Sequence, residues 1–518
     1  MKFYVTTPIF YINAKPHIGH AYTTIAADVL ARYHKIIGDK TFFLTGVDEH
    51  GASIEKKAKK ANLDPKKFAD KISAEFQLTW DELDISNDFF IRTTEAKHKK
   101  TVQNALQYLY DNGDIYLGKY EGLYCKGCEQ YKSEKDLIDG KCPDHQKNPE
   151  KISEECYMFK MSAYQDKLLE LIKTDKLKIR PIERKNEILN FYKDGLKDIS
   201  FSRKNVKWGI QLPWDKSQTV YVWADAFLNY LTGLGWDGNL KKIPEMWPAD
   251  IHLMSKDILR VHSTIWLAML LALDLPLPKQ LFIHGYFLID GQKMSKSIGN
   301  VIAPKDLVKK YGVDGTRYLL MSATPFGHDG DVGLKKFDEK YNADLANGLG
   351  NLVARSITLV EKMQDVGIKM QNINKKLQIT NSKSQINPKL QISNYKIDKS
   401  WKNYMDSLKN LQIDKAIDTF KSEIKILDNY ITSTKPWEMI KNKDEQVKVI
   451  MYFILEKLRH IAWMLLPFMP DTAEKIWESL GLDITEEKEK KFSKATKWGG
   501  LNPKTKIKKS KPLFPRIN

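Results

Sequence analysis

The chain begins with a short apolar run typical of a β-strand. Apolar residues then recur at the spacing of an α-helix. Residues 2–10 form a short run rich in β-formers, and apolar side chains then recur at helical intervals from Ile18 to Tyr33. Residues 40–51 predict a buried strand that ends in acidic residues. Strand, helix and strand at this spacing predict a βαβ unit of a parallel sheet.

This α/β rhythm stops and later returns. Between residues 114 and 204, short strands, glycines and a cysteine cluster predict an insertion. Apolar, β-rich runs that end in polar or glycine-containing turns resume near residue 219. The two stretches on either side, 1–113 and 205–336, are therefore predicted to form one α/β domain.

From residue 337 the pattern is almost wholly helical. The first helix has an apolar face formed by Leu345, Leu349, Leu352 and Val353. Residues 446–470 are apolar nearly all round, which is typical of a buried bundle helix. We predict a helical domain over 337–500, with 366–397 as a flexible, lysine-rich insertion and 501–518 as a basic tail.

The composition of the chain indicates a class of binding partner and a cellular compartment. A chain of 518 residues with 42% hydrophobic residues is too long for one core. Its net charge of +18 favours a polyanion such as nucleic acid, although lysine-rich solubility explains the charge equally well. The N-terminus lacks the features of a signal peptide, and no apolar run approaches the roughly 20 residues of a membrane span, so we expect a cytoplasmic protein.

Three of the four cysteines cluster with a histidine. Cys125 and Cys128 form one Cys-x2-Cys pair, and Cys142 and His145 form a Cys-x2-His pair shortly after it. Thiolates and imidazole in paired turns are the ligands of structural zinc, and four protein ligands leave no open position for catalysis. The alternative is three unligated cysteines and a surface histidine, which this pairing disfavours.

Two further motifs suit phosphate. His17 and His20 flank Gly19 at a predicted helix start, where backbone N–H groups and the helix dipole attract anions. A structural histidine pair is the alternative. Lys293 and Lys296 lie three residues apart on a glycine-bounded loop that would close over a polyphosphate, unless it is a solvated lysine loop.

Together, "HIGH" at 17–20 and "KMSKS" at 293–297 resemble the two signatures of class I aminoacyl-tRNA synthetases. A smaller nucleotidyltransferase is the alternative for these motifs, but such chains lack a long helical C-terminal domain. Several further blocks are similar to the methionyl-tRNA synthetase family over almost the whole chain: "TTPIFYINAKPHIGHAYT", "GVDEHG", "VYVWADAF", "SKDILRVHS", "YNADLANGLGNLVAR" and "TKPWE". The 114–204 insertion is too short for the editing domain of the isoleucyl, valyl and leucyl enzymes.

The resemblance implies a fold and a reaction. The α/β domain would be a Rossmann-type catalytic domain, the insertion a zinc-binding connective domain, and the helical domain an anticodon-binding bundle. Methionine would be activated with ATP and Mg²⁺ to methionyl-adenylate and transferred to the terminal adenosine of tRNA(Met). The implied catalytic residues are His17, His20, Lys293 and Lys296, and the implied ATP-binding residues add Gly19, Met294, Ser295 and Ser297.

The resemblance also implies a methionine pocket. Its residues would be Ile9, Tyr11, Asp48, Trp223, Ala226, Tyr230, Ile258 and His262. Asp48 would pair with the substrate amino group, and the Tyr230 hydroxyl would approach the sulfur. Phe227 stands where many relatives have proline, so the backbone conformation of this pocket wall could differ from theirs.

The resemblance further implies that three residues of the helical domain read the anticodon. Asn351 and Arg355 share a helix face, and Trp437 would stack on a base. A surface salt bridge for Arg355 and packing for Trp437 are the alternatives. Two other classes of protein compete with the enzyme: a tRNA-binding protein without catalytic activity and a zinc-ribbon protein. We also expect the protein to be a monomer.

Overall fold

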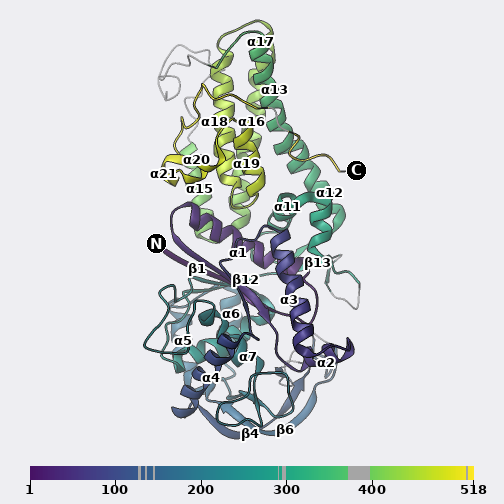
Figure 1. Cartoon of the computed structure of the whole chain (residues 1–518), viewed down its shortest axis with the longest axis vertical. Helices are drawn as coiled ribbons and strands as arrows, with labels where there is room; N and C mark the ends of the chain where they lie inside the picture. The colour runs from purple at the N-terminus through teal and green to yellow at the C-terminus, as the bar shows by residue number, and fades with distance from the viewer. Residues whose placement is uncertain are drawn as a thin grey trace. The chain divides into compact units, whose positions relative to one another are not determined.

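The computed structural model describes all residues except 127–129, 133, 135–136, 144–145, 290, 295–298, 371–396, 509–510 and 518. The described chain forms two compact units, and we treat each by itself (Figure 1). The first comprises Met1–Ala27 and Lys40–Tyr286, and the second Asp28–Asp39 and Phe287–Asn518.

A six-stranded sheet is the centre of the first unit. Its strands, in spatial order, are β3 (Phe89–Arg92), β2 (Lys40–Asp48), β1 (Lys2–Tyr11), β11 (Ile251–Ser255), β12 (Gln280–His284) and β7 (Lys178–Arg180). All neighbouring strands pair in parallel, which confirms the predicted Rossmann-type sheet. Strands β2 and β11 flank β1, so the strand order changes direction there, and ligands of such sheets bind at the carboxyl ends beside this point.

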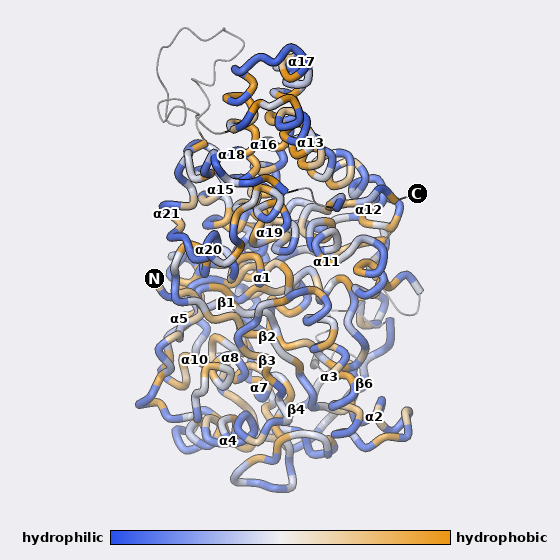
Figure 2. The backbone as a smooth tube through the Cα atoms, turned by 45° about the horizontal axis from the view of Figure 1, so that its top comes forward, coloured by the Kyte–Doolittle hydropathy of each residue, from blue (hydrophilic) through white to orange (hydrophobic). Residues whose placement is uncertain are grey.

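Helices connect and cover these strands (Figure 1). They are α1 (Ile18–Ile36), α2 (Ala52–Lys60), α3 (Pro65–Glu82), α4 (Ala96–Asp111), α5 (Gln165–Lys173), α6 (Ile182–Tyr192), α7 (Val222–Ala226), α8 (Asn229–Thr232), α9 (Leu259–Val261) and α10 (Leu267–Ala272). A π-helix, His262–Trp266, joins the last two. Figure 2 shows hydrophobic residues along α1, and the apolar side chains of this helix are buried. Helix α3 begins where Asp64 accepts hydrogen bonds from two backbone N–H groups.

The predicted insertion contains a second sheet. Strands β4 (Ile115–Cys125), β5 (Gln130–Lys132), β6 (Glu150–Phe159) and β8 (Ile199–Ser200) form it, all antiparallel. The short strands β9 (Ser202–Arg203) and β10 (Thr219–Val220) pair beside it. Residues 178–180 also fall in the range 114–204, yet they form β7 at the edge of the parallel sheet. A three-residue strand is too short to show a period in the sequence.

Where it is described, the second unit is helical apart from three short strands, β13 (Phe287–Ile289), β14 (Gln292–Lys293) and β15 (Gly330–Asp331). Its helices are α11 (Pro304–Ser322), α12 (Leu334–Lys340), the π-helix Tyr341–Gly350, α13 (Asn351–Asp365), α15 (Ile397–Lys409), α16 (Ile413–Thr434), α17 (Pro436–Lys441), α18 (Val447–Leu465), α19 (Pro470–Ser479), α20 (Ile484–Glu489) and α21 (Phe492–Ala495). Helix α18 is buried along most of its length, as its sequence predicts. Most of the predicted insertion 366–397 lies outside the described residues.

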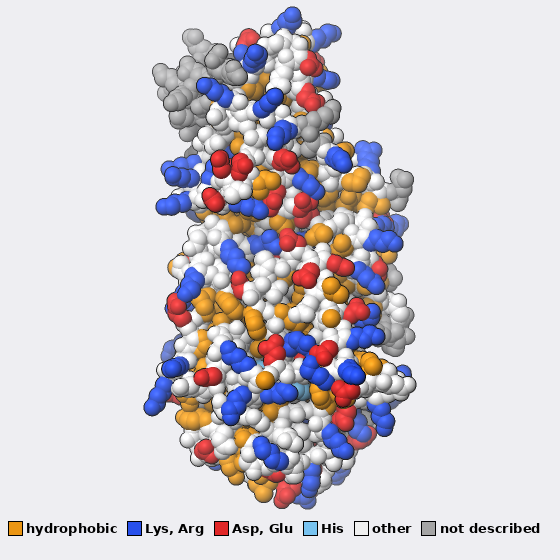
Figure 3. All heavy atoms as spheres, viewed as in Figure 1, with side chains coloured by type: hydrophobic (Ala, Val, Ile, Leu, Met, Phe, Trp, Pro, Cys, Tyr) orange, Lys and Arg blue, Asp and Glu red, His pale blue; other side chains and the backbone are white. Residues whose placement is uncertain are grey.

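The predicted basic tail packs on this unit where it is described. Phe514 is buried, with its ring 6.0 Å from that of Tyr341. The backbone N–H and carbonyl of Ile517 both hydrogen-bond the Asn342 side chain, at 3.0 and 2.8 Å. On the face seen in Figure 3, Lys and Arg side chains are interspersed with Asp and Glu rather than gathered in one patch. In the described part of the chain, no helix combines the length and apolar character needed to cross a bilayer.

Candidate active site

The two histidines of the "HIGH" motif cap the first turn of α1. The Nδ1 atom of His17 accepts the backbone N–H of Gly19 at 3.1 Å, and Nδ1 of His20 accepts the backbone N–H of His17 at 3.1 Å. The two rings stack at 3.8 Å. Because Nδ1 is an acceptor in both rings, each neutral imidazole carries its proton on Nε2. The pair therefore supplies two ring N–H donors at a helix N-terminus, an arrangement that suits an anion.

Aromatic side chains hold this pair in place. The rings of Phe10 and Phe76 meet His20 edge-on at 5.0 and 5.4 Å, and Trp80 lies against both phenylalanines. Phe10 lies near the end of strand β1, and the other two belong to α3. The position of His20 is thus set by the strand end and by a second helix, as well as by α1.

Asp48 closes β2 beside the end of β1. It pairs in register with Tyr11, while Ile9 pairs with Gly46. Asp48 is buried to 8% exposure, and the Ile9 and Tyr11 side chains are half-buried. A side chain at Gly46 would lie 2.2 Å from the Ile91 carbonyl oxygen, so glycine allows β2 and β3 to pair here.

The residue after Asp48 was not predicted as part of the site. The Glu49 carboxylate accepts hydrogen bonds from Arg92 at 2.8 Å, from the backbone N–H of Thr94 at 3.2 Å, and from the Ser73 hydroxyl. These contacts fix the loop that follows β2. The sequence contains Glu49 within the block "GVDEHG", but neither its residue type nor its spacing distinguishes it from other acidic residues. The sequence alone therefore could not identify it.

The predicted side-chain walls of the methionine pocket are buried or half-buried. Trp223 and Ala226 belong to α7, and Tyr230 belongs to α8. The Tyr230 hydroxyl lies 2.8 Å from Nε2 of His262, whose Nδ1 lies 2.9 Å from the carbonyl oxygen of Ile258. A carbonyl only accepts, so Nδ1 carries the proton and Nε2 accepts the Tyr230 hydrogen. That hydrogen is therefore not directed at a thioether sulfur while His262 holds this tautomer.

Burial keeps His262 neutral. It is 1% exposed, and this burial lowers its pKa from 6.5 to about 4, although the Ile258 carbonyl opposes the shift. A neutral, apolar-bounded ring suits an uncharged side chain such as a thioether. His262 also starts the π-helix, a feature often found at functional sites.

Phe227 leaves the backbone of the wall unstrained. Its φ of −60° and ψ of −30° are ordinary helical values, and the φ is also the one that proline requires. Its ring packs edge-on against His262 at 4.9 Å and stacks on Trp266 at 5.8 Å. The aromatic ring therefore adds packing behind His262.

The "KMSKS" motif belongs to the second unit and is described only in part. Lys293 ends β14, where its backbone pairs with Leu288 of β13. Met294 is half-buried. Ser295, Lys296 and Ser297 lie outside the described residues, so their predicted contacts with ATP stay predictions.

Two of the four predicted zinc ligands are described, and both are buried. Cys125 ends β4, and Cys142 follows a tight turn in which Ile138 and Lys141 bond each other's backbone. The N–H of Gln146 bonds the Cys142 carbonyl at 2.7 Å. Cys128 and His145 lie outside the described residues, and among the described residues no group of three or more His, Cys, Asp or Glu side chains is placed to hold a metal ion. Buried thiols, one at a strand end and one after a tight turn, are of a ligand type that suits zinc.

The predicted anticodon residues lie on two helices that touch, α13 and α17. Asn351 is exposed at the start of α13. Arg355 forms an ion pair with Asp428 of α16 at 2.6 Å, which is the alternative anticipated for it. Trp437 on α17 is 40% exposed, which fits both a stacking role and the alternative of a partly buried packing residue. A half-exposed ion pair costs little to open, which leaves the guanidinium available for another anion.

Comparisons with known proteins agree with these observations. A family model described as "tRNA synthetases class I (M)" matches residues 3–151 and 134–357, and one described as "Anticodon binding domain of methionyl tRNA ligase" matches residues 384–518. A methionine–tRNA ligase of Caldanaerobacter subterraneus is 42% identical over 100% of this chain and 79% of its own length. That of Bacillus subtilis is 42% identical over 99% and 78%. A solved Mycobacterium tuberculosis methionyl-tRNA synthetase in complex with methionyl-adenylate matches with a TM-score of 0.90 and 33% identity, and covers 100% of both chains.

Proposed function

The chain belongs to the methionyl-tRNA synthetases, and from that premise we propose how its residues activate methionine and charge tRNA. It is a methionine–tRNA ligase of the class I aminoacyl-tRNA synthetases. The observation that supports our assignment best is the pair of stacked histidines, whose Nδ1 atoms cap α1 and whose Nε2 atoms carry the protons.

In the first step the methionine carboxylate attacks the α-phosphate of ATP, and pyrophosphate leaves. Negative charge builds on the phosphoryl oxygens as the new bond forms. The Nε2–H groups of His17 and His20 would donate to these oxygens, and Gly19 would leave room for the nucleotide. Lys293 and Lys296 would bind the β- and γ-phosphates, with Met294, Ser295 and Ser297 shaping their loop. Mg²⁺ would accompany ATP and neutralise part of its charge.

The methionine side chain would lie between two walls. Asp48 would bind the ammonium group, with Ile9 and Tyr11 beside it. Trp223, Ala226 and Tyr230 would line one side of the thioether, and Ile258 and His262 would close the other. The neutral His262 fits this role, since a cation there would be costly next to an apolar side chain.

A structural zinc ion would bind the connective domain through Cys125, Cys128, Cys142 and His145. The buried thiols of Cys125 and Cys142 support this proposal. Zinc would tie the two turns together, and four protein ligands would give it no open position for substrate.

The second unit would bind the anticodon of tRNA(Met) through Asn351, Arg355 and Trp437. The exposed indole of Trp437 supports a base-stacking role, because stacking on aromatic side chains is how proteins usually hold unstacked bases. We further propose that the enzyme acts as a cytoplasmic monomer.

Replacing Trp437 by alanine tests this division of labour. We expect tRNA charging to fall by about 10- to 100-fold, since loss of one stacked base is worth about 1–3 kcal/mol. Methionine-dependent ATP–pyrophosphate exchange should stay near the wild-type rate, because it needs no tRNA. The same exchange assay, run with leucine, isoleucine and cysteine, checks the amino acid.

The matched control is Ile426→Ala, which truncates an equally exposed side chain on α16 of the same unit. It should leave both activities unchanged. Unaltered charging by Trp437→Ala would contradict the anticodon assignment, whereas joint loss of charging and exchange would show a folding defect.

A further inference from the structure

A buried carboxylate in the first unit joins two histidines, and none of the three has a role in the site described so far. Asp225 lies on α7 and is 1% exposed. Its Oδ2 atom lies 2.6 Å from Nδ1 of His50, and its Oδ1 atom lies 2.8 Å from Nε2 of His98. His50 follows β2, and His98 belongs to the first turn of α4. One side chain therefore connects three elements.

The protonation states of this cluster follow from its contacts. Burial by itself would raise the pKa of Asp225, but the two histidines outweigh it and lower the pKa to about 2. As a carboxylate, Asp225 accepts on both oxygens, so His50 donates from Nδ1 and His98 from Nε2. Nδ1 of His98 is buried and has no hydrogen-bond partner among the described residues, which suits a lone pair better than an N–H group.

The cluster is joined through the backbone to both ends of the proposed methionine pocket. His50 is two residues beyond Asp48, and Asp225 stands between Trp223 and Ala226. The backbone around His50 is held as well. Trp208 donates its indole N–H to the Glu49 carbonyl at 2.6 Å, and its own carbonyl accepts the N–H of Gly51 at 3.0 Å.

Helix α7 needs such an anchor. It has only five residues and no side-chain cap, and a helix this short has little stability of its own. Apolar packing would bury it but would allow small shifts along the sheet. Two charge-assisted hydrogen bonds in different directions define its position, because their strength depends on distance and angle.

We propose that Asp225 is a positioning residue for methionine: through His50 and His98 it sets the distance between the ammonium-binding Asp48 and the thioether wall at Trp223. This inference rests on the proposed roles of Asp48 and Trp223. A displacement of about 1 Å between substrate-positioning groups can cost roughly 100-fold in rate. Loosening the cluster should therefore weaken the use of methionine and leave the use of ATP unchanged.

The two histidines allow a crossed test with matched variants. The amide nitrogen of asparagine occupies nearly the position of histidine Nδ1, and that of glutamine nearly the position of Nε2. Only His50→Asn and His98→Gln can therefore keep their hydrogen bonds to Asp225. His50→Gln and His98→Asn introduce the same amide group at the wrong distance, so general effects of polarity on folding are matched.

The measurement is ATP–pyrophosphate exchange at varied methionine and varied ATP, together with thermal melting of each variant. We expect the methionine KM of His50→Gln and His98→Asn to rise about tenfold or more. His50→Asn and His98→Gln should stay within about threefold of wild type, and all four should keep the wild-type KM for ATP. Equal effects of asparagine and glutamine at either position, a parallel rise in the ATP KM, or failure of His50→Asn or His98→Gln to fold would overturn the proposal.

Asp48→Asn separates this inference from the assignment on which it rests. If Asp48 binds the ammonium group, that variant raises the methionine KM whatever the crossed variants show. An unchanged methionine KM in Asp48→Asn would overturn the proposed pocket itself. A raised KM there, with no difference between the crossed variants, would overturn the positioning role alone.

Discussion

The role open to each histidine of the candidate active site depends on which of its ring nitrogens already forms a hydrogen bond. In His17 and His20 the capping of α1 uses Nδ1, so the side chains that cap the helix are also the proposed phosphate donors. In His262 the Ile258 carbonyl uses Nδ1, so Nε2 must accept from Tyr230. Two histidine sites of one enzyme thus hold opposite tautomers, one suited to an anion and one to a thioether.

Removing the Tyr230 hydroxyl tests the second tautomer. In Tyr230→Phe the Nε2 lone pair of His262 is buried without a donor, and the ring cannot switch tautomer without losing the Ile258 bond. We expect the free energy of unfolding to fall by about 1–3 kcal/mol, the cost of an unsatisfied buried acceptor. The methionine KM should rise, while the ATP KM should not. Chemical denaturation and the exchange assay measure these quantities.

Tyr192→Phe is the control for that change. Its hydroxyl is also buried and donates to the Ser263 carbonyl at 2.7 Å, one residue from His262. It should leave the methionine KM within about twofold of wild type. If the two variants behave alike, the Tyr230–His262 bond has no special bearing on methionine.

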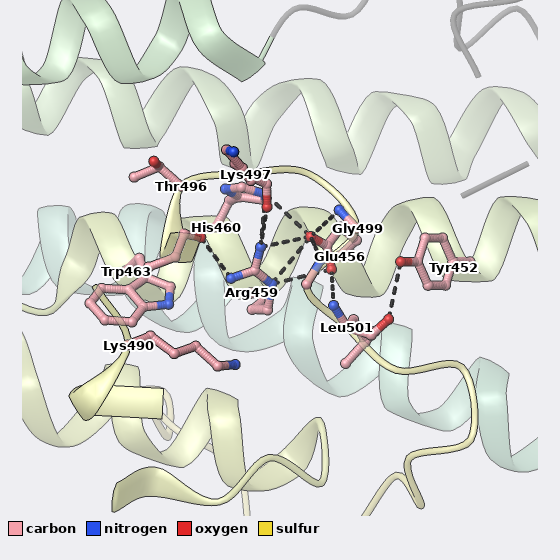
Figure 4. Close-up of polar contacts among 12 residues, drawn as sticks. Tyr452, Glu456, Arg459, His460, Trp463, Lys490, Thr496, Lys497, Gly499 and Leu501 are labelled. Atoms are coloured by element: carbon pink, nitrogen blue, oxygen red, sulfur yellow. Dashed lines mark hydrogen bonds and ion pairs between the residues drawn. The ribbon is translucent and has the colours of Figure 1, made fainter. Parts of the chain in front are cut away.

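At the scale of elements, a buried ionic network joins α18 to the segment that follows α21 (Figure 4). Glu456 accepts the backbone N–H groups of Gly499, Gly500 and Leu501 at 2.7–2.9 Å. Arg459 pairs with Glu456 at 2.7 Å and donates to the carbonyls of Ala495 and Lys497 at 2.8 and 2.9 Å. Neither charged side chain is exposed, so each depends on the other and on this backbone.

Glu456→Gln should release that segment. The amide turns an N–H group toward donors and leaves Arg459 buried with only the more distant carboxylate of Glu487, at 3.4 Å. We expect a loss of about 3–5 kcal/mol in the free energy of unfolding of the second unit, as for other broken buried pairs. Proteolytic cleavage within 496–508 should become faster, and mass spectrometry locates the cuts.

Asp418→Asn is the control at this scale. It breaks the exposed pair of Asp418 with Lys415 on α16, which is worth at most about 1 kcal/mol. Cleavage within 496–508 should not change. Equal cleavage in Glu456→Gln and wild type would contradict the anchoring role of Glu456.

For the whole molecule, buried histidines predict sensitivity to acid. Burial lowers the pKa of His262 and of His284 from 6.5 to about 4, and it lowers the pKa of His252 well below its usual value. Between pH 6.5 and 4 the unfolded chain therefore binds more protons than the folded one, and stability falls as the pH falls. At pH 5 each of His262 and His284 should cost on the order of 2 kcal/mol relative to pH 7.5.

Glu456 affects stability at a lower pH than the buried histidines do. Its pKa is lowered, because its contacts with His460 and Arg459 outweigh the effect of burial. Its contribution is present above the unfolded pKa of about 4.3 and is lost as the pH falls below that value. Melting followed by tryptophan fluorescence should thus show a lower midpoint at pH 5 than at pH 7.5, with a further loss below about pH 4. A midpoint that is equal or higher at pH 5 would contradict the first expectation.

The sequence alone determined the elements and the chemistry that depend on neighbouring residues. The strand–helix–strand start, the buried α18 and the place of the histidine pair at a helix start all follow from local spacing, because periodicity acts over a few residues. Tertiary structure alone decided which distant groups meet. Asp225 lies 175 residues from His50 and 127 from His98, and Arg355 lies 73 from Asp428. Each of these contacts depends on the packing of separate elements, and a buried charge acquires its partner only when the chain has folded around it.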